Sequence, residues 1–228
     1  MRDSVAVGSA PDHVIDVSVG AWMPARLGPR GSVGGLVPVG FDSYIRVGHH
    51  DGAEEHEFGV TRETLAVLCD VIRRSVAVDQ CLFAIWDGYG WVNGGGGMQW
   101  GWAEGSVPDP KLMAATEAAY AAPAFADGVL DGPKLSLSSR SYYLFEGSLD
   151  SALEVGKRNQ ILDSEHFEPH VPDLIWPRDR SWFIGTDTDL WFAYVGGSDA
   201  LVHEIAADPR LESRAVSTSD WFGEVEPH

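Results

Sequence analysis

One segment constrains the fold more than any other: "TRETLAVLCDVIRRSVAVDQCLFAIW", residues 61–86. Its apolar residues recur at helical spacing as far as Val76, and Thr61 is a suitable N-cap. "QCLFAIW" is then an apolar run with the length and composition of a buried strand. The segment therefore predicts a long amphipathic helix that leads directly into a core strand.

The other predicted elements are shorter and do not alternate strictly between helix and strand. Strands are predicted in "HVIDVSV", "SRSYYLFEGSL", "DLIWP", on both sides of "TDTDL" and in "SRAVST". Helices are predicted in "DPKLMAATEAAYAA", "SLDSALEVGKRNQ" and "SDALVHEIAADPRLE", and an exposed loop in "DSEHFEPHVPD". "LVPVGFDSYIRVGHH" is compatible with a strand or a short helix.

This order of elements favours an α+β fold. We expect a single domain over residues 13–220, with a mixed, largely antiparallel sheet flanked by three to four helices. Residues 1–12 are expected to form a flexible N-terminal lead-in, and residues 221–228 a C-terminal tail.

The charge of the chain limits its partners. There are 34 acidic residues against 16 basic ones, which gives a formal net charge of -18. Nucleic-acid binding needs a basic surface, and anionic membranes attract basic segments, so neither partner is expected. A protein partner is expected to be basic, although an acidic surface also serves solubility alone.

The N-terminus lacks an apolar run long enough for a signal peptide, and no segment approaches a membrane span, so a cytoplasmic location is expected. Cys69 and Cys81 flank the end of the predicted helix and the start of the strand. They are compatible with a disulfide or with two buried thiols.

A glycine- and tryptophan-rich stretch, "IWDGYGWVNGGGGMQWGW", follows this strand. A dinucleotide-binding loop needs Gly-x-Gly-x-x-Gly that opens into a helix, because the helix amides bind phosphate. Here the third glycine, Gly94, comes one residue late, and the next predicted helix begins about fifteen residues further on. Phosphate binding is therefore not expected, and no cofactor is predicted.

The aromatic residues of this stretch are candidate ligand- or partner-binding residues. Flat aromatic faces bind cations and C–H groups, and an adjacent carboxylate attracts positive charge. The candidates are Trp86, Asp87, Tyr89, Trp91, Trp100 and Trp102. The alternative is that Trp86 is a core residue of its strand and the others close a loop over the core.

Two clusters contain residues that could ligate a metal ion. "GHHDGAEEHE" offers His49, His50 and His56 among acidic residues, but such a run is also typical of a solvated loop. "EHFEPH" differs from a zincin motif, because its glutamate is misplaced and Pro169 lies between the histidines. No metal site is predicted, and the three histidines are the candidate ligands if the protein binds a metal ion.

If the protein is an enzyme, its candidate catalytic residues are Asp87, Asp187 and Asp189. "TDTDL" places the last two on one side of an extended chain, where they could divide acid and base roles, with His49 or His50 as an auxiliary base. The same sequence is typical of a turn, because Asp side chains bond to their own backbone. No Gly-x-Ser-x-Gly nucleophile motif occurs.

The pieces "CLFAIWDGYG", "RSYYLFEG" and "DLIWPRDRSWFIGTDTDLWFAYVGGSDALV" resemble a family of uncharacterised actinobacterial proteins with no assigned reaction. The spacing of Pro38, Phe41, Tyr44 and Gly52 is similar to that in the SMI1/KNR4-like immunity superfamily. The second resemblance implies an α+β protein that binds and neutralises a toxin. We therefore expect a non-enzymatic binding protein for a basic or amphipathic partner, with a hydrolase that uses paired carboxylates or a metal ion as the alternative.

Overall fold

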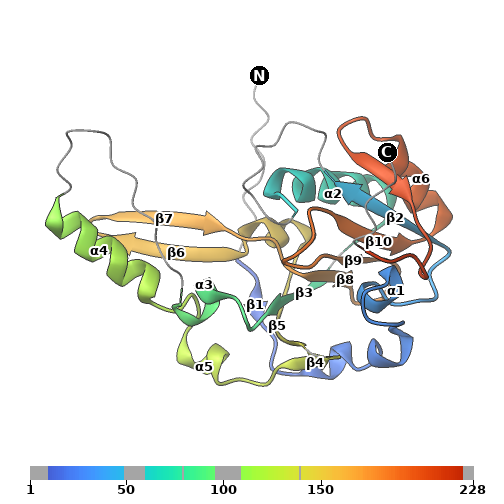
Figure 1. The fold of residues 1–228 in the computed structure, drawn as a ribbon. Coiled ribbons are helices and arrows are strands. Elements are labelled where there is room, and N and C mark those ends of the chain that lie inside the picture. Colours follow the sequence, from blue (N-terminus) through green and yellow to red (C-terminus); the bar gives the residue numbers. More distant parts are fainter. Residues whose placement is uncertain (1–9, 49–59, 79, 96–108, 139, 223–228) are drawn as a thin grey trace.

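The centre of the computed structural model is an antiparallel sheet, to which the described residues contribute nine strands (Figure 1). The structure describes residues 10–48, 60–78, 80–95, 109–138 and 140–222. The strands lie in the order β1-β5-β3-β8-β9-β10-β2-β11, with β4 also paired to β5. They are β1 (Asp12–His13), β2 (Ser43–Gly48), β3 (Cys81–Trp86), β4 (Leu135–Leu137), β5 (Arg140–Gly147), β8 (Leu174–Pro177), β9 (Phe183–Gly185), β10 (Ala193–Gly197) and β11 (Glu212–Ala215). The predicted α+β class and the single domain are confirmed.

Two helices cover one face of the sheet. They are α2 (Arg62–Ser75) and α6 (Asp199–Ala207), which pack against each other and against the strands. Thr61 accepts a hydrogen bond from the Thr64 amide, and Ser198 accepts one from the Leu201 amide. Both side chains thus cap a helix N-terminus, as the sequence predicts.

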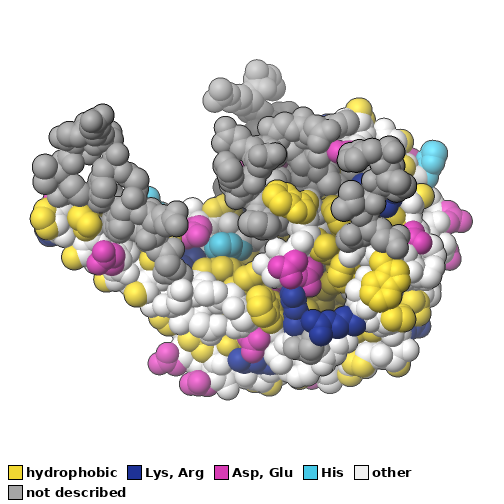
Figure 2. Space-filling model, in the orientation of Figure 1, with side chains coloured by type: hydrophobic (Ala, Val, Ile, Leu, Met, Phe, Trp, Pro, Cys, Tyr) yellow, Lys and Arg dark blue, Asp and Glu magenta, His cyan; other side chains and the backbone are white. Residues whose placement is uncertain are grey.

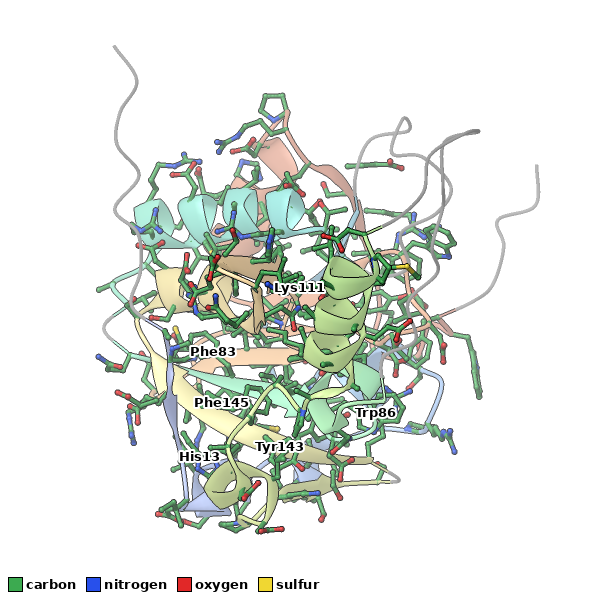
Figure 3. All side chains as sticks on the ribbon, turned by 90° about the vertical axis from the view of Figure 1, so that its left-hand side faces the viewer. His13, Phe83, Trp86, Lys111, Tyr143 and Phe145 are labelled. Atoms are coloured by element: carbon green, nitrogen blue, oxygen red, sulfur yellow. The ribbon has the colours of Figure 1, made fainter. Side chains whose placement is uncertain are left out.

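The opposite face is covered by short helical segments near the N-terminus. These are the 3₁₀ helices η1 (Val17–Gly20) and η2 (Pro24–Arg26) and the short helix α1 (Val33–Leu36). Along β3, Phe83 and Ile85 belong to the core on the α2 side, whereas Leu82 and Ala84 belong to the core on the α1 side. Phe83 lies directly opposite Phe145 of β5 (Figure 3). Because both faces of β3 are buried, its sequence is continuously apolar rather than alternating.

A hairpin and a helix project from the sheet as an arm, seen on the left of Figure 1. The arm consists of β6 (Gly156–Ile161), β7 (Ser164–Pro169) and α4 (Pro110–Ala121), which packs on β6. Lys157 of β6 is 2% exposed, and its ammonium donates to the carbonyls of Tyr120 and Ala122, at 2.9 and 2.6 Å. The buried lysine therefore satisfies carbonyl groups at the C-terminal end of α4 that the helix itself leaves unbonded.

Three predicted elements are wrong. "DSEHFEPHVPD" contains β7 rather than a loop, because its polar residues pair along β6 and because Phe167 packs beneath the Arg158 guanidinium. "SLDSALEVGKRNQ" is helical only in the 3₁₀ helix η3 (Leu149–Glu154), since Gly156 approaches the Glu168 carbonyl to begin the hairpin. "HVIDVSV" bonds to β5 only at its first two residues, His13 and Val14, and then forms η1, with Asp16 as its cap.

The remaining helices are α3 (Gly90–Asn93) and α5 (Asp127–Leu130). No helix within the described ranges has the length and apolar character needed to cross a membrane. Cys69 and Cys81 are both buried free thiols, and burial raises the pKa of each to about 12. The two cysteines are therefore buried thiols in this structure and do not form a disulfide with each other.

Candidate functional site

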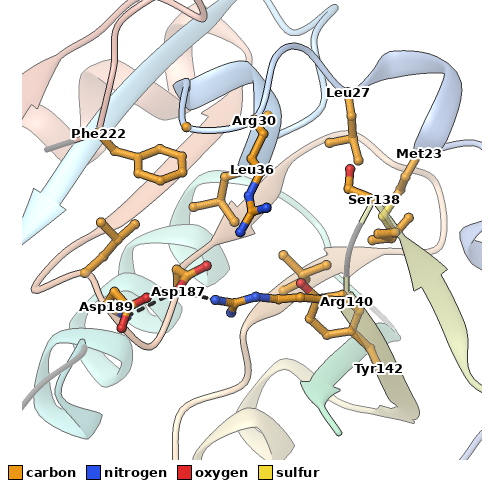
Figure 4. A pocket seen from close by; sticks show the side chains of 15 residues that line it. Met23, Leu27, Arg30, Leu36, Ser138, Arg140, Tyr142, Asp187, Asp189 and Phe222 are labelled. Atoms are coloured by element: carbon orange, nitrogen blue, oxygen red, sulfur yellow. Dashed lines mark hydrogen bonds and ion pairs between the residues drawn. The ribbon is translucent and has the colours of Figure 1, made fainter. Parts of the chain in front are cut away.

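A cavity of about 360 Å³ opens between the N-terminal helical segments, the start of β5 and the loop from β9 to β10 (Figure 4). Its walls are largely apolar, with contributions from Met23, Leu27, Leu36, Leu137, Leu174, Leu190 and Phe222. Its polar side chains are Arg30, Ser138, Arg140, Tyr142, Asp187 and Asp189. Figure 2 shows basic and acidic side chains meeting in a hollow on this face, beside hydrophobic ones. An apolar concavity with a few polar groups is the usual form of a small-molecule site.

An ion pair crosses this cavity. The Arg140 guanidinium donates to an Asp187 carboxylate oxygen at 2.9 Å, and their side chains are 20% and 17% exposed. The same guanidinium lies 4.5 Å from the centre of the Trp86 ring. Arg140 is therefore held on one side by charge and on the other by a cation–π contact.

Asp187 and Asp189, two of the candidate catalytic residues, form the predicted turn. The Leu190 amide donates to the Asp187 carbonyl at 2.9 Å, and the Asp189 amide donates to the Asp187 side chain at 3.2 Å. Both carboxylates also line the cavity. The interpretations as a turn and as a site are thus compatible, because the turn places both carboxylates at the cavity.

Asp87, the third candidate, does not line this cavity. Its carboxylate accepts a hydrogen bond from the Lys134 ammonium at 3.0 Å, and the ammonium also lies 4.7 Å from the Tyr143 ring centre. The positive group that Asp87 attracts is therefore a lysine of the same chain. The structure brings two of the three candidate carboxylates together and leaves the third in a separate ion pair.

The described aromatic candidates contact the protein itself. Trp86 packs beneath Arg140, the Tyr89 hydroxyl donates to Asp173 at 2.8 Å, and Trp91 stacks on His170 with ring centres 4.1 Å apart. The four-residue helix α3, which was not predicted, begins directly after Tyr89 and ends before Gly94. The next helix among the described residues is α4, which begins at Pro110, as predicted. Trp100 and Trp102 lie outside the described residues. Binding of a ligand or partner by these aromatics stays a prediction.

Asp173 is a buried acid that the sequence analysis missed. It is 1% exposed, and its carboxylate accepts hydrogen bonds from the Trp86 amide at 2.7 Å and from the Tyr89 hydroxyl. Burial raises the pKa of Asp173 to about 6, against the opposing effects of these hydrogen bonds and of nearby Arg140. The one signal in the sequence is an aspartate placed directly before the apolar strand "LIWP".

A smaller cavity of about 110 Å³ shares Asp187 with the larger one. It is lined by Val60, Tyr89, Trp91, His170, Val171, Thr186, Asp187 and Thr188. Burial and nearby Lys157 lower the pKa of His170 to about 4, so its imidazole is neutral at pH 7. Its Nε2 atom is buried without a hydrogen-bond partner and lies 3.6 Å from a Glu168 carboxylate oxygen.

The metal candidates His49, His50 and His56 lie outside the described residues. Within the described part of the chain, no group of three or more His, Cys, Asp or Glu side chains is placed to hold a metal ion.

Comparison with known proteins found no match to a family model, to a curated protein or to a solved structure.

Proposed function

We propose that this chain is a non-enzymatic binding protein, and that the cavity beside the Arg140–Asp187 ion pair receives an amphipathic partner. The observation that carries the proposal is the composition of the cavity wall. Leucine, methionine and phenylalanine side chains form its apolar part, and charged side chains of both signs lie along it. Such a wall favours a partner with an apolar body and a charged or polar end.

The state of the candidate catalytic groups supports binding over reaction. The carboxylate of Asp187 is bonded to Arg140, and that of Asp87 to Lys134. A general base must be within reach of the proton that it removes. Both carboxylates already accept a hydrogen bond from a cation of the same chain, an arrangement that suits a structural role.

The charge of the chain limits the partner further. A net charge of -18 repels polyanions, so nucleic acid is not the proposed partner. A protein partner that docks at this face through an exposed apolar side chain would need a neutral or basic surface around it. If the occupant of the cavity belongs to a protein, we therefore propose that this protein is basic.

We expect the anionic dye 1-anilinonaphthalene-8-sulfonate to bind in the cavity, because it combines apolar rings with one charge. Leu27→Trp should weaken this binding at least tenfold, since Leu27 is a half-buried side chain of the cavity wall. Dye fluorescence measured against protein concentration gives the affinity.

The matched control is Ile15→Trp, which adds the same ring at a position that is 71% exposed and does not line the cavity. Equal dye affinity in the wild type and both variants would show that the dye binds elsewhere and would contradict the proposal.

A hydrolase with paired carboxylates is a second candidate, because Asp187 and Asp189 both line the cavity. Asp189 has no side-chain hydrogen bond or ion pair among the described residues, so it is the carboxylate left for an acid–base role. On this hypothesis, the protein hydrolyses p-nitrophenyl butyrate, and Asp189→Asn lowers the rate at least a hundredfold. A rate that equals the buffer rate, or that survives this substitution, rejects the hypothesis.

A further inference from the structure

Two charged side chains of the cavity wall have no partner of their own. In the part of the chain that the structure describes, neither the Arg30 guanidinium nor the Asp189 carboxylate makes a hydrogen bond or an ion pair. In contrast, the other two charged side chains of the wall, Arg140 and Asp187, are bonded to each other. Figure 4 shows Arg30 directed into the cavity from one side and Asp189 on the other, with the ion pair between them.

The wall is therefore electrically balanced, with two positive and two negative side chains, yet it keeps one unpaired group of each sign. A ligand with a single charge can satisfy only one of them. A ligand that carries an ammonium and a carboxylate can pair with both, and charge-assisted hydrogen bonds of this kind are the strong ones.

Two hydroxyl groups add hydrogen-bonding capacity at the same wall. Tyr142 and Ser138 line the cavity, and no side-chain hydrogen bond involves either hydroxyl among the described residues. Burial raises the pKa of Tyr142, so its hydroxyl keeps its proton and can donate to a ligand oxygen. These two hydroxyls could therefore donate hydrogen bonds to a carboxylate or carbonyl oxygen of a bound ligand.

We infer that the ligand is a zwitterion with an apolar side chain, namely a free α-amino acid or a short peptide. The inference rests on the proposed binding function and names its ligand class. Arg30 pairs with the carboxylate, Asp189 pairs with the ammonium, and the leucine-rich wall receives the side chain. A volume of about 360 Å³ lies at the small end of ligand sites, which suits a ligand of one or two residues.

Displacement of the dye tests this ligand class. L-leucine and the dipeptide Leu-Leu keep both charges, N-acetyl-L-leucine loses the ammonium, and L-leucinamide loses the carboxylate. At least one of the two zwitterions should displace the dye, and both blocked compounds should do so at least tenfold more weakly. Tighter binding of L-leucine would identify the ligand as a free amino acid, and tighter binding of Leu-Leu would identify it as a short peptide.

Variants assign the two charges to the two side chains. Arg30→Gln should weaken the binding of the zwitterion about tenfold or more but leave that of L-leucinamide unchanged. Asp189→Asn should weaken the zwitterion similarly and leave N-acetyl-L-leucine unchanged. Arg26→Gln and Asp163→Asn are matched controls, because both residues are exposed and neither lines the cavity.

The outcomes separate this inference from the function on which it rests. If the dye binds in the cavity but the zwitterions displace it no better than the blocked compounds, the ligand class is wrong and the binding function stands. If Leu27→Trp leaves dye binding unchanged and no zwitterion binds, the proposed function itself fails.

Discussion

The stability of the wild type relative to the Asp173→Asn variant is expected to fall by roughly 2 to 3 kcal/mol as the pH rises from 4 to 8. The folded chain raises the pKa of Asp173 from 3.8 to about 6, so it binds a proton more tightly than the unfolded chain does. The stability that this proton provides is fully present below pH 3.8 and is lost as the pH rises through about 6. Asparagine does not titrate and removes this contribution.

Urea denaturation of both proteins across this pH range measures the difference. The asparagine side chain of the variant can keep the contacts of the neutral acid, because its oxygen can accept from the Trp86 amide and its NH₂ group can donate to the Tyr89 hydroxyl. Asp173→Ala is the matched control: it leaves both donors without an acceptor and should be about 2 to 4 kcal/mol less stable than the asparagine variant at every pH. A difference between wild type and Asp173→Asn that does not change with pH would show that the carboxyl group titrates normally.

Lys157→Met should release the C-terminal end of α4 from the hairpin. The methionine keeps the length of the side chain but leaves the carbonyls of Tyr120 and Ala122 without their donor. Leaving a partly buried acceptor of this kind unsatisfied costs about 1 to 3 kcal/mol. We expect a loss of about 2 to 4 kcal/mol in the stability of the arm, measured as faster amide hydrogen exchange over residues 110–121.

Lys111→Met is the control for this experiment, because Lys111 is an exposed residue on the first turn of the same helix. Exposed substitutions of this kind change stability by less than about 0.5 kcal/mol. If exchange in α4 is the same in Lys157→Met as in the control, the buried ammonium does not hold the helix.

The elements that could be predicted from the sequence are those with a strong local signal. Helix α2 has an apolar stripe and a capping threonine, and β3 is continuously apolar because both of its faces are buried. The turn at Asp187 was predictable because an aspartate side chain bonds to its own backbone.

The hairpin of β6 and β7 had no such signal. Its strands are mostly polar, and the contacts that stabilise it, such as the one from Lys157 to α4, join residues more than thirty positions apart. The cavity was unpredictable for the same reason. Arg30, Arg140 and Asp189 come together only through the order of the strands, and Asp173 is recognisable only once its burial is known.

The cavity wall draws on the chain from Met23 to Phe222, so its parts are made at very different times during synthesis. The segment that contains Phe222 is bonded to the start of α1 and to the loop before it, with the Val33 amide donating to the Asp220 carbonyl and the Phe222 amide donating to the Gly31 carbonyl. A nascent chain that ends before this segment has an incomplete wall, whatever the state of its other strands. A ligand would therefore bind in the cavity only after the whole chain has folded. It would stabilise only the completed molecule, by a free energy that grows with the logarithm of the ratio of ligand concentration to Kd.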